Sequence, residues 1–255
     1  MSIFNGFFVG FWAPLKAIRP VFSQPRLTSL VAVPLFINLG LYILFFYYGS
    51  NALSGLIQEW TQGLSHSLPA WAVEFSRISL KILAWLTLGL IGALSFTVVS
   101  GVISAPFNDA LSRATFKMRY QQLGLKPDRA FTEISIKQSI TLELKRMAIL
   151  IVGSVTAILI GLIPFLQLPA LALGAFLLAF EYFGYPLSHR SSSLVSVFLF
   201  VFRYPLVSLG FGSFLLVIMA LPFTSVLYIP LAVVGGTTLF VDLETKKKLL
   251  LGEQS

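Results

Sequence analysis

One pattern in this chain occurs twice, over residues 163–181 and 221–242, and it pairs two apolar runs across an uncharged turn. In each copy a Pro-Phe dipeptide follows an apolar run, and a second proline opens the next run. Counted from that second proline, a glycine stands five residues on and an acid twelve residues on. The shared positions are Pro169, Gly174 and Glu181 in the first copy, and Pro230, Gly235 and Asp242 in the second. A loop that emerged into water would normally contain Gly, Asn, Ser and charged residues.

The apolar runs beside these turns are short for a membrane crossing. They cover 148–163, 170–183, 207–221 and 231–241, so the shortest has 11 residues. A helix needs about 20 residues to cross a hydrocarbon core of ~30 Å, whereas 11 residues rise only roughly 17 Å. The pattern therefore predicts two re-entrant helical hairpins, at 148–183 and 207–241, with tips shielded by protein or facing a wet cavity. Two ordinary hairpins with buried turns are the alternative.

The composition places the chain among all-α integral membrane proteins, because 56% of its 255 residues are hydrophobic and only 11% are charged, against about 25% charged in soluble domains. There is no cysteine, which excludes disulfides and thiolate chemistry. His66 and His189 are far apart in the sequence. With no hydrolase triad order, His-Glu metal motif or phosphate-binding glycine loop, we predict no enzymatic activity, no metal and no cofactor.

The rest of the chain predicts a single membrane domain over residues 1–255. We expect an amphipathic interfacial helix at 1–22, spanning helices at 30–48 and 78–102, a cytoplasmic helical extension at 104–146 and a basic tail at 243–255. Tryptophans and acids mark 49–76 as an interfacial or aqueous segment. Asn108 and Asp109 are expected to end the second spanning helix, and Lys126-Pro127-Asp128 to divide the extension into two helices.

Basic residues indicate the orientation of this domain. If the N-terminus lies inside, all of the 18 lysines and arginines except Arg77 and Lys81 fall on the inner side. This asymmetry follows the positive-inside rule and predicts that both termini are cytoplasmic. The formal net charge of +8 is thereby explained by topology, and no nucleic-acid partner is expected.

Several short motifs resemble, in their order and spacing, the CysZ family, which belongs to a wider family named after an etoposide-induced eukaryotic protein. They are Gln24-Pro25, Val33-Pro34-Leu35 with Asn38, Ala105-Pro106-Phe107-Asn108, Tyr185-Pro186, and 230–242 with Gly235-Gly236-Thr237-Thr238 inside it. The resemblance covers about residues 6–242. It implies two long spanning helices, two half-penetrating hairpins, homo-oligomers in the membrane, and passive entry of sulfate for cysteine synthesis.

One departure from that family concerns the substrate. CysZ proteins typically carry glycine, leucine or isoleucine and a basic pair after the Gln-Pro dipeptide, and that segment holds sulfate. Here the residues are Arg26, Leu27, Thr28 and Ser29. A helix start offers free N–H groups to an oxyanion, and Arg26 adds one charge and the hydroxyls add donors. We therefore expect sulfate or a related oxyanion to bind here, although losing two cations should weaken a dianion site.

Four other polar residues are candidates for either structural or pore roles. Asn38 is expected to bond between helices or to line a pore, and Asn108 to mark the helix end. Glu181 and Asp242 are expected to pair with Arg190 and Lys246, with ion handling as the alternative. At the level of function, the alternative to a permease is a non-transporting membrane scaffold or an envelope or lipid-homeostasis protein.

Overall fold

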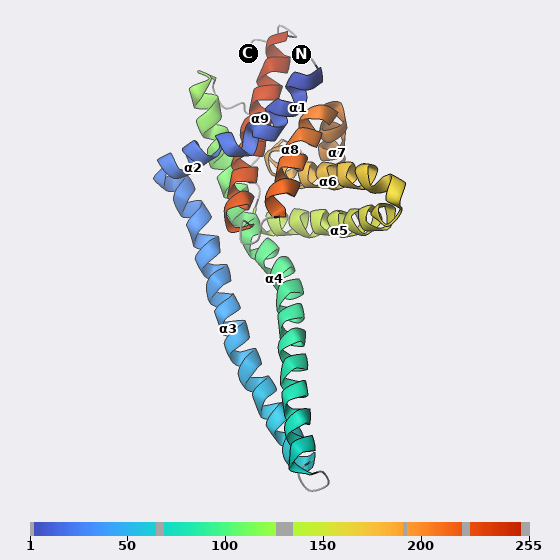
Figure 1. Cartoon of the computed structure of the whole chain (residues 1–255). Helices are drawn as coiled ribbons and strands as arrows, with labels where there is room; N and C mark the ends of the chain where they lie inside the picture. The colour runs from blue at the N-terminus through green and yellow to red at the C-terminus, as the bar shows by residue number, and fades with distance from the viewer. Residues whose placement is uncertain (1–2, 65–68, 126–134, 191–192, 221–224, 251–255) are drawn as a thin grey trace. The chain divides into compact units, whose positions relative to one another are not determined.

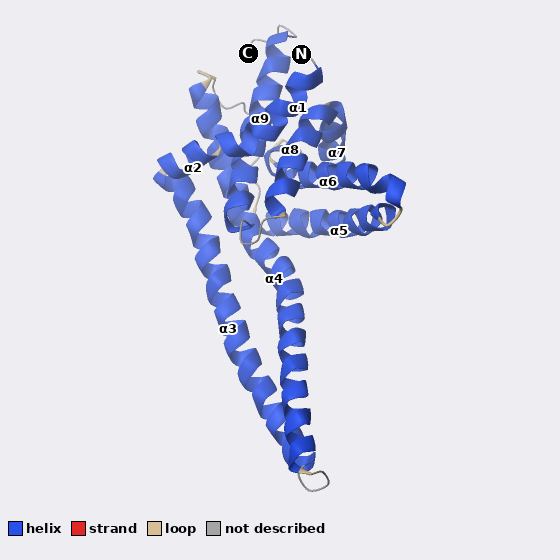
Figure 2. Ribbon diagram, in the orientation of Figure 1, coloured by secondary structure: helices blue, strands red, loops and turns tan. Residues whose placement is uncertain are grey.

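A computed structural model of the chain describes residues 3–64, 69–125, 135–190, 193–220 and 225–250. Within these ranges every regular element is a helix (Figures 1 and 2), which confirms the all-α class. The helices are α1 (Ile3–Lys16), α2 (Ile18–Ser23), α3 (Pro25–Leu64), α4 (Ala70–Gln122), α5 (Ile136–Gly161), the 3-10 helix η1 (Pro164–Leu166), α6 (Gln167–Ser188), α7 (Leu194–Arg203), α8 (Pro205–Met219) and α9 (Ser225–Leu250).

Four helical segments of the described chain are long and apolar enough to cross a membrane: Pro25–Gly63, Ala70–Gly92, Ile136–Gly161 and Pro164–Ser188. A fifth candidate is the pair α7 and α8, whose axes bend by 101° at a short break. Length and composition are compatible with both full and partial crossing, so the division into two spanning helices and two re-entrant hairpins stays a prediction.

The two helices predicted to span the membrane are longer than expected. The helix predicted at 30–48 extends to Leu64, and most of the segment at 49–76 is helical; its interfacial or aqueous location stays a prediction. The second helix continues through Asn108 and Asp109 to Gln122, and the prediction that these residues end it is wrong. Pro106 lies inside α4, where a proline removes one backbone hydrogen bond and crowds the carbonyl of the preceding turn, yet the helix continues. Asn108 has a tertiary partner instead of a capping role, as described below.

The hairpins also differ in detail from the predictions. Ser135 and Gln138 form a capping box, so α5 begins twelve residues before the apolar run expected at 148. Pro230 lies inside α9 rather than at its start. Between the two predicted hairpins lies the helix α7, which is capped by the Ser193 side chain. The predicted break at Lys126-Pro127-Asp128, His66 and part of the second turn lie outside the described residues.

The chain forms two compact units, and the single-domain organisation stays a prediction. Unit 1 comprises residues 1–33 and 104–255. In it α9 packs against α1, α6 and α8, with Val233, Val234 and Phe211 fully buried, and α5 and α6 run side by side from η1 (Figure 1). Small residues allow the closest approach, since a side chain at Gly10 or Gly210 would overlap the facing helix backbone.

Unit 2 comprises residues 34–103, the facing parts of α3 and α4. Gly49 faces Leu88 and Gly92 faces Phe45, so the two helices run antiparallel. Many large apolar side chains of this unit are exposed, among them Phe36, Ile43 and Leu86. Such a large apolar surface indicates contact with lipid or another protein.

Candidate functional site

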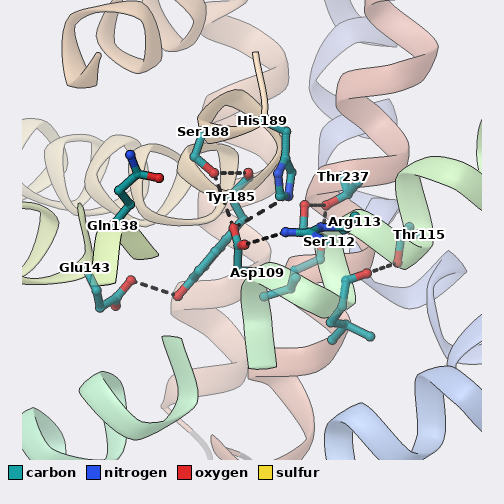
Figure 3. Close-up of polar contacts among 12 residues, drawn as sticks. Asp109, Ser112, Arg113, Thr115, Gln138, Glu143, Tyr185, Ser188, His189 and Thr237 are labelled. Carbon is teal, nitrogen blue, oxygen red and sulfur yellow. Dashed lines mark hydrogen bonds and ion pairs between the residues drawn. The ribbon is translucent and has the colours of Figure 1, made fainter. Parts of the chain in front are cut away.

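Unit 1 buries a group of polar and charged side chains between α4, α5 and α6, which we call the buried polar cluster (Figure 3). Its buried members are Asn108 and Asp109 of α4, Glu143 and Arg146 of α5, Tyr185 and Ser188 of α6, and His189 immediately after α6, and the half-buried Arg113 of α4 and Glu181 of α6 adjoin them. The α6 positions follow a spacing of four and three residues, which places them on one helix face. Ionisable residues inside membrane proteins are functional candidates by default.

An ion pair between Glu143 and Arg146 forms one half of this cluster. The Nη2 of Arg146 lies 2.9 Å from Oε2 of Glu143, and Arg146 is only 3% exposed. The hydroxyl of Tyr185 donates to the same Glu143 oxygen at 3.2 Å, and Nδ2 of Asn108 donates to that hydroxyl at 3.3 Å. These contacts compensate for the burial of both charges.

Arg146 is also held directly against α6. Its guanidinium lies 4.0 Å from the centre of the Tyr185 ring, and its Nη1 donates to the backbone carbonyl of Glu181 at 3.2 Å. The absence of a side chain at Gly184 makes this position possible, because a Cβ there would lie 2.9 Å from Cδ and Nη1 of Arg146. The Gly184-Tyr185 dipeptide therefore forms the surface of α6 against which Arg146 packs.

Asp109 forms the other half of the cluster with looser contacts. Its Oδ1 lies 3.5 Å from the donating Ser188 hydroxyl and 3.5 Å from Nε2 of His189, and its Oδ2 lies 3.8 Å from Nη2 of Arg113. Burial raises the pKa of Asp109 to about 6, although the Arg113 and Arg146 charges and the Ser188 hydrogen bond lower it. This carboxyl, which lies beyond the apolar part of α4, can therefore change protonation near neutral pH.

The buried polar cluster is closed to sulfate in this conformation. The cavity beside Arg146, lined also by Gly184 and Ser188, has a volume of about 10 Å³. Such a volume holds about one water molecule. The arrangement can therefore stabilise charge inside the protein, but an anion could reach Arg146 only after the helices separate.

The structure places the predicted oxyanion residues at the start of α3, which begins at Pro25. Arg26 and Ser29 are exposed, whereas Leu27 is buried. The Thr28 hydroxyl donates to the carbonyls of Val21 at 2.8 Å and Gln24 at 3.2 Å, and the Ser29 hydroxyl donates to the carbonyl of Arg26 at 2.9 Å. Both hydroxyl groups thus donate their protons to backbone carbonyls, and oxyanion binding at this segment stays a prediction.

The other predicted candidates lie in different surroundings. Asn38 is buried in unit 2 and lines a cavity of about 80 Å³ with Tyr42, Gly92 and Ser95. Asn108 belongs to the buried polar cluster. These placements are compatible with both roles proposed for Asn38, because the cavity is small but polar groups border it.

The expected partners of the two hairpin acids need correction. Arg190 binds Glu244 at 3.2 Å rather than Glu181; it lies beyond the end of α6 at Ser188. Asp242 is held by Arg119, with contacts of 2.7 Å and 3.0 Å to its two carboxylate oxygens. Sequence reasoning paired these acids with local bases and missed partners that lie far along the chain.

The sequence prediction also missed most of the buried polar cluster. Glu143 and Arg146 stand within a basic stretch, where they resemble ordinary cytoplasmic charges. The available signal was their position just before a long apolar run, because a pair of charges at the start of such a run is expected to be buried with it. Their partner Tyr185 could not be identified from spacing, since it lies 42 residues from Glu143.

A family model described as Sulfate transporter CysZ/Etoposide-induced protein 2.4 matches residues 13–230 of this chain. The chain belongs to this family. The match confirms the resemblance inferred from the motifs, and it includes the whole buried polar cluster. It ends before Asp242 and Glu244, which contribute the ion pairs of α9.

Curated relatives of the CysZ family cover most of the chain. A protein of Pseudomonas fluorescens is 27% identical over 226 residues, which is 86% of this chain and 88% of the relative. Relatives in Pseudomonas paraeruginosa and Pectobacterium atrosepticum are each 25% identical, over 89% and 86% of this chain and 92% and 80% of their own length. All three are named sulfate transporter CysZ.

Proposed function

We propose that this chain is a CysZ-type sulfate permease of the bacterial inner membrane, which supplies sulfur for cysteine biosynthesis and catalyses no reaction. The observation that carries the proposal is the family match over residues 13–230, together with full-length similarity to relatives named sulfate transporters. The apolar helices of both units agree with a multi-pass membrane protein.

Flux measurement tests this function directly. Purified protein reconstituted into liposomes should admit radiolabelled sulfate faster than empty liposomes do. The alternative is a non-transporting scaffold or a lipid-homeostasis protein, and the observation that favours it is the closed cavity of about 10 Å³ beside Arg146. A scaffold would leave sulfate entry at the rate of empty liposomes.

The proposed topology has α3 and the first part of α4 as spanning helices, two re-entrant hairpins, cytoplasmic termini and homo-oligomeric assembly. Exposed apolar side chains at the first hairpin turn support it, since Phe165 is 91% and Leu168 78% exposed, which is costly in water. A cysteine replacing Gln167 should resist an impermeant thiol reagent added outside, whereas one replacing Glu74 should react. Rapid labelling of both positions would contradict the re-entrant topology.

We further propose that the oxyanion binds at Arg26, Leu27, Thr28 and Ser29. The exposed Arg26 charge stands at the N-terminus of a 40-residue helix, whose dipole favours anions by about 0.3–1 kcal/mol. A hydrogen bond to a charged group contributes roughly 1.5–3 kcal/mol, so Arg26→Ala should weaken sulfate binding about ten- to a hundredfold.

Calorimetry on purified protein measures this effect, with Lys137→Ala as the control for a lost exposed charge. A triple variant with Arg26→Gly, Thr28→Arg and Ser29→Arg, which restores the family pattern, should bind sulfate more tightly than the native chain. If neither the native nor the restored protein binds sulfate, this segment is not the oxyanion site.

A further inference from the structure

A polar cleft of about 590 Å³ opens in unit 1 between α1, α2, the end of α4 and α9. Its polar lining includes Lys16, Arg19, Gln24, Arg119, Thr238 and Asp242. The volume falls within the range of about 300–1,000 Å³ that is typical of small-molecule sites. None of the residues of the buried polar cluster or of the proposed oxyanion site lines it.

Packing around Gly235 explains why this space exists. A Cβ at Gly235 would lie 2.8 Å from Cα of Pro14 and 2.9 Å from the Ala13 carbonyl oxygen, so α9 touches α1 there. Ala17, the residue between α1 and α2, lines the cleft, and Met118 and Gln122 of α4 line it opposite. Gln24 bridges the far side, where its Nε2 donates to Sδ of Met118 at 2.9 Å.

The cleft carries more positive than negative charge. Arg119 and Asp242 neutralise each other through their two short contacts of 2.7 Å and 3.0 Å. Lys16 and Arg19 are exposed, and no acidic side chain in the described part of the chain pairs with them. The cleft therefore presents two uncompensated cations, one of which is a guanidinium suited to two-point binding of a phosphate.

The helices that carry these cations also carry exposed aromatic residues. Phe8 and Trp12 of α1 and Phe22 of α2 are about half or more exposed. Aromatic and basic residues on one short helical segment are typical of segments that lie at a membrane interface. Such a location would place the cleft at the level of lipid headgroups and within reach of soluble ligands.

We propose that this cleft binds a phosphate ester, with Lys16 and Arg19 holding the phosphoryl oxygens and the remaining volume accommodating the organic part. The ester is either the headgroup of an anionic phospholipid or a soluble organic phosphate. Gln24 and Thr238 supply neutral donors beside it. The site is separate from sulfate permeation and would exist whether or not the chain conducts sulfate.

Two binding measurements on the detergent-purified full chain distinguish the sources. Native mass spectrometry with phosphatidylglycerol reports the lipid, and calorimetry with glycerol 3-phosphate reports the soluble ester. A Lys16→Gln/Arg19→Gln variant should bind at least about tenfold more weakly, because each lost charge-assisted hydrogen bond is worth a factor of ten or more. Both side chains are exposed, so the variant should fold normally.

The matched control is Lys137→Gln/Lys145→Gln, which removes two exposed charges from α5 and should bind like the native chain. A second variant, Thr238→Phe, fills the cleft without changing its charge and should also weaken binding. Binding of the lipid alone assigns a headgroup, and binding of glycerol 3-phosphate assigns a soluble ester as well. The proposal is overturned if the native chain binds neither probe, or if the charge variant and the control bind equally well.

Discussion

The two copies of the repeated pattern share their sequence spacing but not their surroundings. The first copy continues into α6, whose early residues such as Leu168 are exposed while its end is buried. The second copy lies largely in α9, where Val233, Val234 and Val241 are completely buried against α1, α6 and α8. The same pattern therefore builds, in one place, a helix that is exposed at its start and buried at its end, and in the other a helix that is mostly buried over residues 230–241.

The surroundings of the acids at the ends of the two copies also differ, because the charges near Glu181 are more buried than those near Asp242. The backbone of Glu181 binds the buried Arg146, beside the Glu143–Arg146 pair. Asp242 pairs with Arg119 where their side chains are 39% and 29% exposed. The first copy thus closes beside a desolvated ion pair, and the second copy closes in an ion pair that water still reaches. Equivalent positions in a repeat need not have equivalent energetic roles.

Removing the arginine beside each acid should show the largest difference. Arg146→Met leaves Glu143 buried without its cation, and breaking a buried pair costs about 3–5 kcal/mol. Arg119→Met breaks a solvated pair, which is worth about 0–1 kcal/mol. Thermal unfolding in one detergent should therefore show a large loss of melting temperature for the first variant only. A Glu143→Met/Arg146→Met double variant should recover much of that loss, and equal losses for the two single variants would contradict the comparison.

The cluster at the end of the first copy should also make stability depend on pH. Asp109 faces Arg113, Arg146 and His189, and burial raises its pKa from 3.8 to about 6. The folded state therefore binds this proton more tightly than the unfolded state, so its contribution to stability is full below about pH 4 and is lost as the pH rises through 6.

Because one pKa unit corresponds to about 1.4 kcal/mol, the loss due to Asp109 between pH 4 and pH 7 is up to roughly 3 kcal/mol. Melting temperatures of the native chain and of Asp109→Asn over this range measure it. The variant should lack the part of the decline that belongs to Asp109, and parallel pH profiles for the two proteins would show that the carboxyl does not titrate as described.

The paired glycines should give a smaller difference. At Gly235 an added Cβ would meet Pro14 and the Ala13 carbonyl below 3.0 Å, and overpacking of this kind costs about 1–3 kcal/mol. At Gly174 the nearest atom is Cδ2 of Leu216 at 3.7 Å, so alanine fits and gains helix propensity of up to about 1 kcal/mol. Gly235→Ala should therefore lower the melting temperature, and Gly174→Ala should leave it unchanged or raise it. The reverse order would mean that α9 is not the more tightly packed copy.

Local signals in the sequence were sufficient for much of the fold. The membrane class, the helical hairpin around Pro164 and the helix start at Pro25 follow from apolar runs and prolines, which act within a few residues. The same locality explains the error at Asn108 and Asp109. A short polar stretch normally favours the end of a helix, but α4 continues through this one.

The sequence by itself determined that this protein is an all-helical member of the CysZ family, because composition, motif order and spacing are properties of the linear chain. Only the tertiary structure decided which charges meet. Arg119 reaches Asp242 across 123 positions, and Tyr185 reaches Glu143 across 42. Such partners are selected by helix packing at glycines such as Gly184 and Gly235, and buried charges need those partners because lipid and protein interiors offer no water.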